Sequence, residues 1–428
     1  MLGFDPQVYQ KITLDNDLRI FTIEMPHVRS ISTGFFLGVG SRYEEDRLAG
    51  ASHFIEHMLF KGTERRPDAR EIATAIEGIG GVFNGSTGRE LTVYWAKVAQ
   101  EHLLVALDVL VDMLRHALFE PAQVEKERRV IMEEINITLD SPSDLVHLLI
   151  NQLVWPDHPL GRDVAGTKES VANMGREDVL AYMHSHYGPA NTVVGVAGNI
   201  DHDQTVKRIA DYLGDWQGGG ESDYLPVTEE QKEPRLHIYN KDTEQAHLCL
   251  SVPGLHHTHP DRFILRLLNT ILGEGMSSRL FLEIREKRGL AYSVNSHLSY
   301  LKDAGASVTY AGVDPQNAPE AIQAILGEWD RLRQELVPAE ELSKAKEYVK
   351  GRTVLQMEDT YSNASWLAGQ ELLTGEILTV EEVLDIIDSV TADEVQRVAQ
   401  KLFVGDKLNL AVVGPFDSER EFEHLLVL

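Results

Sequence analysis

Two histidines, His53 and His57, stand four residues apart, and Glu56 directly precedes the second. Residues i and i+4 of a helix share one face, with Cβ atoms roughly 5–6 Å apart. Two imidazoles at this spacing can therefore chelate one metal ion. Glu56 lies three residues after His53 and projects near the same face. The order H-x-x-E-H reverses H-E-x-x-H, in which the histidines bind zinc and the glutamate is a general base. This stretch predicts zinc-assisted hydrolysis.

The pair of histidines is weak evidence without a third ligand. The chain has 17 histidines in 428 residues, so about 0.7 pairs four apart are expected by chance. A catalytic zinc site needs three protein ligands and an open position for water, and Glu134 is the best candidate for the third. The alternative is a helix whose two histidines only pack beneath a sheet.

The glutamates downstream complete a longer pattern. Seventy-six residues separate His57 from Glu134, and Glu127 lies seven residues before Glu134, so both glutamates face the same way on a helix. In these motifs the chain resembles the pitrilysin family of inverzincins, which includes insulin-degrading enzyme and the mitochondrial processing peptidases. The resemblance covers nearly the whole chain. It implies one Zn²⁺ per chain, held by His53, His57 and Glu134. It also implies that Glu56 is the general base and that Glu127 orients a ligand or the water network.

Residues 82–98 are expected to form two strands beside the metal site. In the family, the corresponding Asn-Ala-x-Thr segment is an edge strand to which the substrate peptide adds through backbone hydrogen bonds. Asn84 and Thr87 match this pattern, and Gly85 stands where the family has alanine. Asn84 is therefore a candidate substrate-binding residue. The alternative is that Asn84 is an ordinary turn residue.

The elements that must position these residues follow from hydrophobic periodicity. Alternation predicts a hairpin over 9–24 and a strand over 28–40. The metal-binding residues fall in a predicted helix over 48–60, with Gly62 at its C-terminal end. Glu127 and Glu134 fall in a helix that begins at Pro121. The remaining elements expected in the first half are helices over 70–79, 102–118, 142–155 and 169–186 and a strand over 191–199.

The second half of the chain repeats this outline, which suggests two similar domains. Glycines 218–220 and an aperiodic charged stretch indicate a linker over 217–234. It would join a catalytic zinc-binding domain over 1–216 to a homologous domain over 235–428. The strands expected there are 236–239, 247–252 and 306–311, and the helices are 262–272, 319–336 and one beginning at Pro338. The expected fold class is α+β, with two homologous domains that are each a β-sheet packed with helices. Together they would form half of a clamshell chamber.

The second domain lacks the metal ligands but carries other candidate residues. Residues 262–267 contain no histidine, and the place equivalent to Glu134 falls near Gly351 or Arg352. In the family, an arginine and a tyrosine seven residues apart reach from the second domain to the substrate, and Arg285 and Tyr292 have that spacing. A guanidinium can hold a peptide carbonyl, and a phenol can donate to an oxyanion.

Two alternatives accompany these candidates. Arg285 could lie in solvent at an ordinary helix-to-strand junction. The histidines within 256–259 are expected in a surface loop rather than a metal site, because the run itself contains no carboxylate and sits in a proline-flanked turn.

Composition excludes several classes of protein. A net charge of −27 argues against a nucleic-acid partner, because phosphates would be repelled. The acidity either favours basic peptides or only maintains solubility. A single cysteine, Cys249, rules out an internal disulfide framework and fits the reducing cytoplasm. No signal peptide or membrane span is expected, because no basic region precedes an apolar run at the start and no eighteen apolar residues run together.

Two classes of function remain. One is a zinc endopeptidase that cleaves peptides or short unfolded proteins enclosed in a chamber. The other is a non-catalytic partner subunit of the same fold, as some family members are. The intact ligand set favours the enzyme, because a scaffold has no need of Glu56. A two-domain chain would supply half of the chamber of four-domain relatives. We therefore expect a homodimer, or a heterodimer with a related chain, in which Arg285 and Tyr292 of one protomer complete the site of the other.

Overall fold

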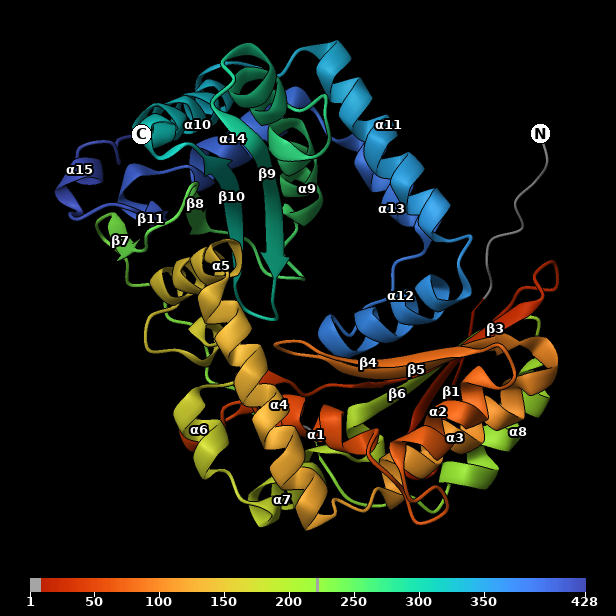
Figure 1. Cartoon of the computed structure of the whole chain (residues 1–428). Coiled ribbons are helices and arrows are strands. Elements are labelled where there is room, and N and C mark those ends of the chain that lie inside the picture. Colours follow the sequence, from red (N-terminus) through yellow and green to blue (C-terminus); the bar gives the residue numbers. More distant parts are fainter. Residues whose placement is uncertain (1–8, 221–222) are drawn as a thin grey trace. The chain divides into compact units, whose positions relative to one another are not determined.

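The computed structural model describes residues 9–220 and 223–428 (Figure 1). It is an α+β protein with two mixed β-sheets that are each packed with helices, as the sequence predicts. The chain divides into two compact units, each built around one sheet. Unit 1 comprises the residues up to Ile135, Arg162–Leu225 and Val354–Thr379, and unit 2 comprises Asn136–Gly161, Pro226–Thr353 and Val380–Leu428.

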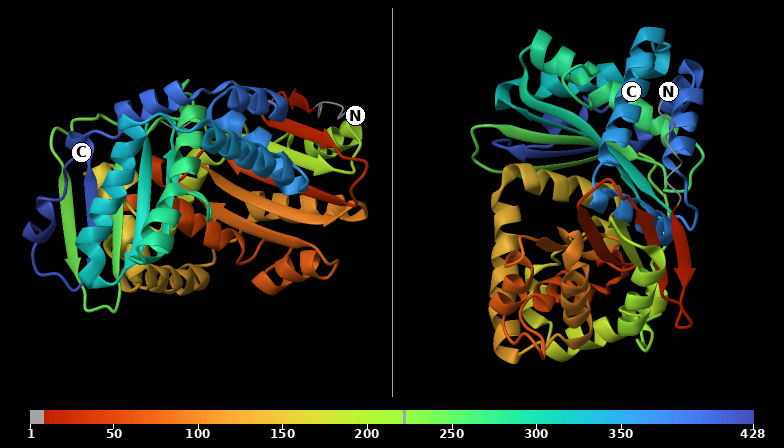
Figure 2. Two further views of the ribbon diagram at one scale, coloured as in Figure 1. Left: turned by 90° about the horizontal axis from the view of Figure 1, so that it is seen from above. Right: turned by 90° about the vertical axis from the view of Figure 1, so that its right-hand side faces the viewer.

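Unit 1 is built on a six-stranded sheet with the order β1-β2-β6-β3-β5-β4. Its strands, seen from two further sides in Figure 2, are β1 (Gln10–Thr13), β2 (Arg19–Glu24), β3 (Ser30–Leu37), β4 (Val82–Thr87), β5 (Thr92–Ala99) and β6 (Thr192–Gly198). The first two form the predicted hairpin. The central strands β3 and β6 are almost wholly buried, as expected of strands covered on both faces. β4 lies at one edge and pairs with β5.

Helices cover both faces of this sheet. On one face lie α1 (Ala51–Leu59), α2 (Ala69–Glu77), α3 (Leu103–His116) and α8 (His202–Leu213). Further helices of the unit are the first part of α4 (Pro121–Asp140), α6 (Lys168–Asn173) and α7 (Arg176–His186). The stretch 169–186, which was expected to be helical, breaks at Gly175, whose extended backbone begins α7.

The opposite face of the unit 1 sheet is covered by α12 (Thr360–Leu373), which comes from the second half of the chain (Figure 1). Val93 packs against α12, whereas the ring of its neighbour Tyr94 contacts Phe60, directly after α1. Successive strand residues point to opposite faces, so these contacts place the two helices on different sides of the sheet. A buried hydrogen bond between the hydroxyls of Ser32 and Thr360, 2.8 Å long, fixes the start of α12.

Unit 2 is built on a five-stranded sheet with the order β7-β11-β8-β10-β9. Its strands are β7 (Arg235–Asn240), β8 (Ala246–Pro253), β9 (Ala291–Tyr300), β10 (Gly305–Val313) and β11 (Asn409–Gly414). Its helices are α5 (Pro142–Val154), α9 (Arg262–Gly273), a π-helix (Phe281–Lys287), α10 (Ala318–Gln334), α11 (Ala339–Gln356), α13 (Val380–Ser389), α14 (Ala392–Leu402) and α15 (Arg420–Glu423).

Short 3₁₀ turns and irregular segments connect these elements. The turns are Ser41–Tyr43, Asp46–Leu48, Gln100–His102, Pro159–Gly161, Pro189–Asn191, Pro315–Asn317 and Gly405–Lys407. Residues 216–220 and 223–234 form neither helix nor strand. The linker expected over 217–234 also includes residues 221 and 222, which lie outside the described residues. Within the described ranges, every helix is too short or too polar to cross a bilayer.

The sheet of unit 2 is covered by α5, which comes from the first half of the chain. Val146, Leu149 and Ile150 of α5 pack in one buried cluster with Cys249, Val308 and Val413 of the sheet. Each sheet is thus covered by one helix from the other half of the sequence, α12 in unit 1 and α5 in unit 2. The two compact units consequently interleave along the chain.

Truncating a buried residue of α5 should destabilise the protein. Ile150 is 1% exposed, and replacing a buried isoleucine by alanine typically costs about 2–5 kcal/mol, because lost burial and a residual cavity add. We expect Ile150→Ala to lower the midpoint of thermal or urea unfolding. Gln152→Ala, on the exposed side of the same helix, is the matched control and should leave the midpoint nearly unchanged. Equal midpoints for the two variants would contradict the packing of α5.

Candidate active site

The helix α1 carries His53, Glu56 and His57 and begins at an unusual buried terminus. Gly50 precedes the helix with a φ of +94° and has no side chain to cap it. The carboxylate of Glu44, which is 3% exposed, accepts hydrogen bonds from the backbone N–H groups of Gly50 and Ser52, both 2.7 Å long. Burial raises the pKa of Glu44, and these two N–H groups oppose that shift. Sequence analysis did not identify Glu44.

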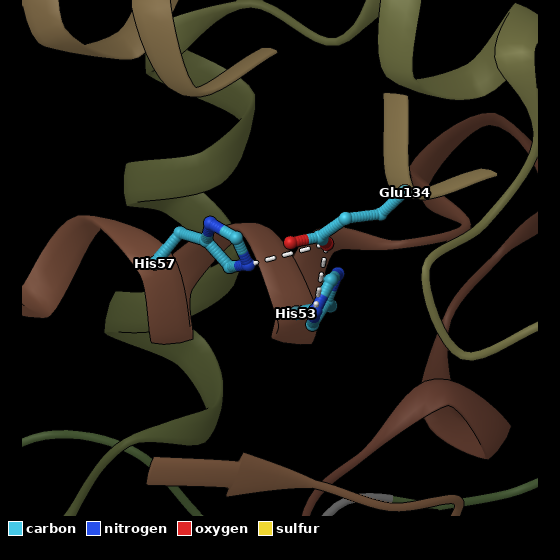
Figure 3. Close-up of side chains that lie close together, drawn as sticks. All are labelled: His53, His57 and Glu134. Atoms are coloured by element: carbon cyan, nitrogen blue, oxygen red, sulfur yellow. Dashed lines mark ion pairs between the residues drawn. The ribbon is translucent and has the colours of Figure 1, made fainter. Parts of the chain in front are cut away.

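Three side chains converge beside α1 (Figure 3). Nε2 of His53 and Nε2 of His57 lie 3.6 and 3.5 Å from Oε2 of Glu134, which projects from α4. Their ligand atoms all lie within 4.8 Å of one another, and no other group of three or more His, Cys, Asp or Glu residues in the described ranges does so. A tetrahedral zinc ion with bonds of ~2.0–2.1 Å places its ligand atoms roughly 3.3 Å apart. The observed separations fit such an ion.

The state of the histidines suits metal binding. Burial, with a smaller contribution from His57, lowers the pKa of His53 to about 4. His53 is therefore neutral at physiological pH, as a metal ligand must be. Both histidines turn Nε2 toward Glu134. In His57 the other ring nitrogen, Nδ1, donates to the carboxylate of Glu127 over 3.2 Å. This hydrogen bond leaves the Nε2 lone pair of His57 free to face a metal ion.

Glu127 is buried, with 1% of its surface exposed. Besides His57, its Oε2 contacts the ammonium group of Lys61 at 3.0 Å. A buried carboxylate needs a cationic or hydrogen-bonding partner, and here it has both. Sequence analysis predicted Glu127 but missed Lys61. The signal was available, since Lys61 follows His57 by four residues.

Glu56 points to the edge strand β4. The hydroxyl of Thr87 donates a hydrogen bond to Oε2 of Glu56, 2.5 Å long. Burial raises the pKa of Glu56, Thr87 and His57 oppose that shift, and the nearby charge of Glu134 adds to it. A methyl group at Gly85 would lie 3.0 Å from Cγ of Glu56 and 3.0 Å from the ring of Phe60. The alanine that the family has at this place would therefore press against Glu56.

The candidate substrate residues are spread over both units. Asn84 lies on the edge strand β4 with its side chain exposed, and its Oδ1 accepts a hydrogen bond from its neighbour Gly85. In unit 2, Arg285 lies in the π-helix and its guanidinium is 4.9 Å from the ring centre of Phe281 and 5.0 Å from that of Tyr292. Tyr292 is the second residue of β9 and is 77% exposed.

The histidines of residues 256–259 lie in the loop between β8 and α9. Nδ1 of His256 contacts the hydroxyl of Thr258 at 3.0 Å, and Nδ1 of His259 accepts a hydrogen bond from the backbone of Asp261. Burial lowers the pKa of His257 to about 4. These side chains are only partly exposed, and their contacts hold the loop together.

Comparisons with known proteins decide the family. Residues 19–168 match the profile described as insulinase, peptidase family M16, and residues 173–349 match that of the peptidase M16 inactive domain. An uncharacterised zinc protease of Bacillus subtilis, YmxG, is 38% identical over 95% of this chain and 98% of its own length. The chain belongs to peptidase family M16. A Streptomyces coelicolor relative, also described as an uncharacterised zinc protease, is 38% identical over 96% of this chain and 90% of its own.

Two solved structures share the fold of this chain. A protease from Helicobacter pylori superposes with a TM-score of 0.91 at 22% identity, covering 96% of this chain and 100% of that chain. A chain of complex III₂ from Candida albicans superposes with a TM-score of 0.81 at 19% identity, covering 98% of this chain and 100% of its own. The M16 membership confirms the resemblance to the pitrilysin family that the sequence motifs indicated.

Removing the Glu44 carboxylate should weaken both the fold and the metal site. Glu44→Ala leaves two buried N–H groups without an acceptor. Each unsatisfied group lowers the free energy of unfolding by about 1–3 kcal/mol. We expect a lower unfolding midpoint, measured calorimetrically, and weaker zinc binding, measured by competition with a chelator. Glu45→Ala is the matched control, because Glu45 is exposed and such changes stay within about 0.5 kcal/mol. An unfolding midpoint for Glu44→Ala equal to that of the control would refute this role of Glu44.

Proposed function

We propose that this M16 protein is a zinc-dependent endopeptidase that cleaves peptides or short unfolded proteins. The observation that carries the proposal is the convergence of His53, His57 and Glu134, with Nε2–Oε2 distances of 3.5 and 3.6 Å. Two imidazoles and one carboxylate are a ligand set found in catalytic zinc sites. The zinc-protease descriptions of the B. subtilis and S. coelicolor relatives support the same activity.

The side chains of the site have separable roles in this proposal. His53, His57 and Glu134 hold one zinc ion per chain. When bound, zinc acts as a Lewis acid that polarises a peptide carbonyl and lowers the pKa of water. Glu56 accepts a proton from the attacking water and passes it to the nitrogen of the leaving amine. Glu127 keeps His57 turned toward the ligand position through their 3.2 Å hydrogen bond.

The substrate in this proposal binds along the edge strand β4. Edge strands present unpaired backbone N–H and C=O groups, and a peptide can add to them with little regard to its side chains. Asn84, exposed on β4, would contact such a peptide. Selection by an enclosing chamber would then depend on the length and unfolded state of the peptide rather than on its sequence.

Arg285 and Tyr292 are proposed to act on the substrate from a second protomer of a homodimer, or of a heterodimer with a related chain. The phenol of Tyr292 is largely exposed and the guanidinium of Arg285 lies against its ring. Stacking of this kind restrains both side chains. A restrained guanidinium and phenol could hold a peptide carbonyl and stabilise the oxyanion that forms from it.

A non-catalytic partner subunit is the second candidate. Residues 173–349 match the profile of the inactive M16 domain, and a chain of C. albicans complex III₂ shares the fold. The two candidates differ in one respect, because only a peptidase requires the carboxylate of Glu56.

Metal analysis and a quenched peptide library separate these candidates. We expect about one zinc per chain and cleavage that a chelator abolishes and zinc restores. Glu56→Gln should keep its zinc but lose roughly 10²–10⁴-fold in kcat, because general-base catalysis is removed. Glu134→Gln should lose zinc, whereas the exposed neighbour variant Glu133→Gln should keep both zinc and activity. Stoichiometric zinc with no cleavage of any peptide would instead favour the scaffold.

Mixing two inactive variants tests the proposed sharing of sites. Glu56→Gln and Arg285→Ala protomers are each defective alone, but a mixed dimer would contain one complete site. Random mixing of a two-fold dimer should therefore recover about a quarter of wild-type activity. An equal mixture of Glu56→Gln with wild type should give half of wild-type activity whether or not the subunits exchange, so it controls for activity lost on mixing. If mass spectrometry shows mixed dimers and activity does not rise, the two residues do not act in trans.

A further inference from the structure

The edge strand β4 contacts α1 through every second residue. The ring of Phe83 lies 5.5 Å from that of Phe60, which directly follows α1. Gly85 lies against the side chain of Glu56, and Thr87 donates a hydrogen bond to that carboxylate. The intervening residues of the strand are exposed, namely Val82, Asn84 and Ser86. One face of the strand therefore forms a wall for the side chain of Glu56.

We propose that Thr87 is a positioning residue that fixes the carboxylate of Glu56 for proton transfer. The inference rests on the proposed function, in which Glu56 is the general base. A glutamate has three rotatable side-chain bonds, and α1 fixes only its backbone. A general base must come within about 2.6–3.2 Å of the group whose proton it accepts. A hydrogen bond of 2.5 Å from Thr87 to Oε2 restrains the carboxylate in a way that the helix alone does not.

The donor is well suited to this role. In the described part of the chain, Thr87 is the one side chain that donates a hydrogen bond to Glu56. Threonine is branched at Cβ and has few χ1 rotamers, and Thr87 is itself held in register opposite Thr92 of β5. The hydroxyl occupies Oε2 of Glu56, so Oε1 remains available to accept the proton of water. Gly85 leaves the space that this orientation of the carboxylate requires.

The arrangement links substrate binding to the base. β4 is the edge strand, so a peptide added along it would pair with the strand that also carries Thr87. The side chain of Thr87 contacts Glu56, so it acts on the base rather than on the peptide. A defect at Thr87 should accordingly affect turnover of the bound substrate more than its binding.

Two substitutions of Thr87 separate the effect of its hydroxyl from the effect of its shape, tested in the zinc-loaded, full-length protein. Thr87→Val keeps the shape and removes the hydroxyl, and Thr87→Ser keeps the hydroxyl. We expect kcat of Thr87→Val to fall roughly 10–100-fold, as is typical when a group that orients a catalytic side chain is lost. KM, zinc content and the unfolding midpoint should stay near those of wild type. Thr87→Ser should retain kcat within about threefold. Thr74→Val, at an exposed position of α2, is the matched control and should keep wild-type kcat.

Several results would overturn the proposal. It fails if Thr87→Val keeps wild-type kcat, if Thr87→Ser is as impaired as Thr87→Val, or if only KM changes. Crystal structures of wild type and Thr87→Val supply a readout that does not depend on activity. The Glu56 carboxylate should leave its wild-type position in Thr87→Val, and an unmoved carboxylate refutes the role of Thr87. If wild type itself cleaves nothing, the proposed function fails while the crystal structures still decide whether Thr87 holds Glu56.

Discussion

The buried start of α1 is the constraint on which the site depends. A Cβ atom at Gly50 would lie 2.4 Å from the backbone oxygen of Ala165, so the chain can approach this closely only at a glycine. The two N–H groups freed there are held by Glu44. Each residue of a helix turns by about 100°, so a helix that began one residue earlier or later would turn His53 and His57 away from Glu134. The ligand geometry is thus fixed by a carboxylate that touches none of the ligands.

The charges around this site favour the binding of a cation. Three carboxylates, those of Glu56, Glu127 and Glu134, surround two imidazoles, of which His53 is neutral because burial lowers its pKa to about 4. Lys61 contacts Glu127 as its counter-ion. Burial raises the pKa of Glu56, and the nearby charge of Glu134 adds to that shift. Opposite charge within a few ångströms stabilises buried carboxylates. A divalent cation between Glu134 and the histidines would relieve the remaining repulsion, so zinc would contribute to stability as well as to chemistry.

The sequence predicts what local periodicity encodes. The spacing of His53, Glu56 and His57 places them on one helical face, and the separation from Glu134 matches a family pattern, so the cluster was predictable. Glu44 and Thr87 were not identified as partners of α1. Their contacts join separate segments of the chain, and hydrophobic periodicity within one segment does not predict its contacts with another. The helix α5 was predicted over 142–155, whereas α12 was not among the expected elements. Which sheet each helix covers is decided by topology, and the alternation of apolar residues carries no information about that choice.

The packing of α12 on the sheet of unit 1 has a consequence for biosynthesis. The strands of this sheet are all made by residue 198, but the apolar face formed by Phe21, Phe36 and Val193 is covered by residues of α12. Ribosomes add ~5–20 residues per second, so that face stays open for on the order of ten to thirty seconds on each nascent chain. During that time a ribosome-associated chaperone could bind to this face. Unit 1 can complete its fold only after α12 has emerged from the ribosome.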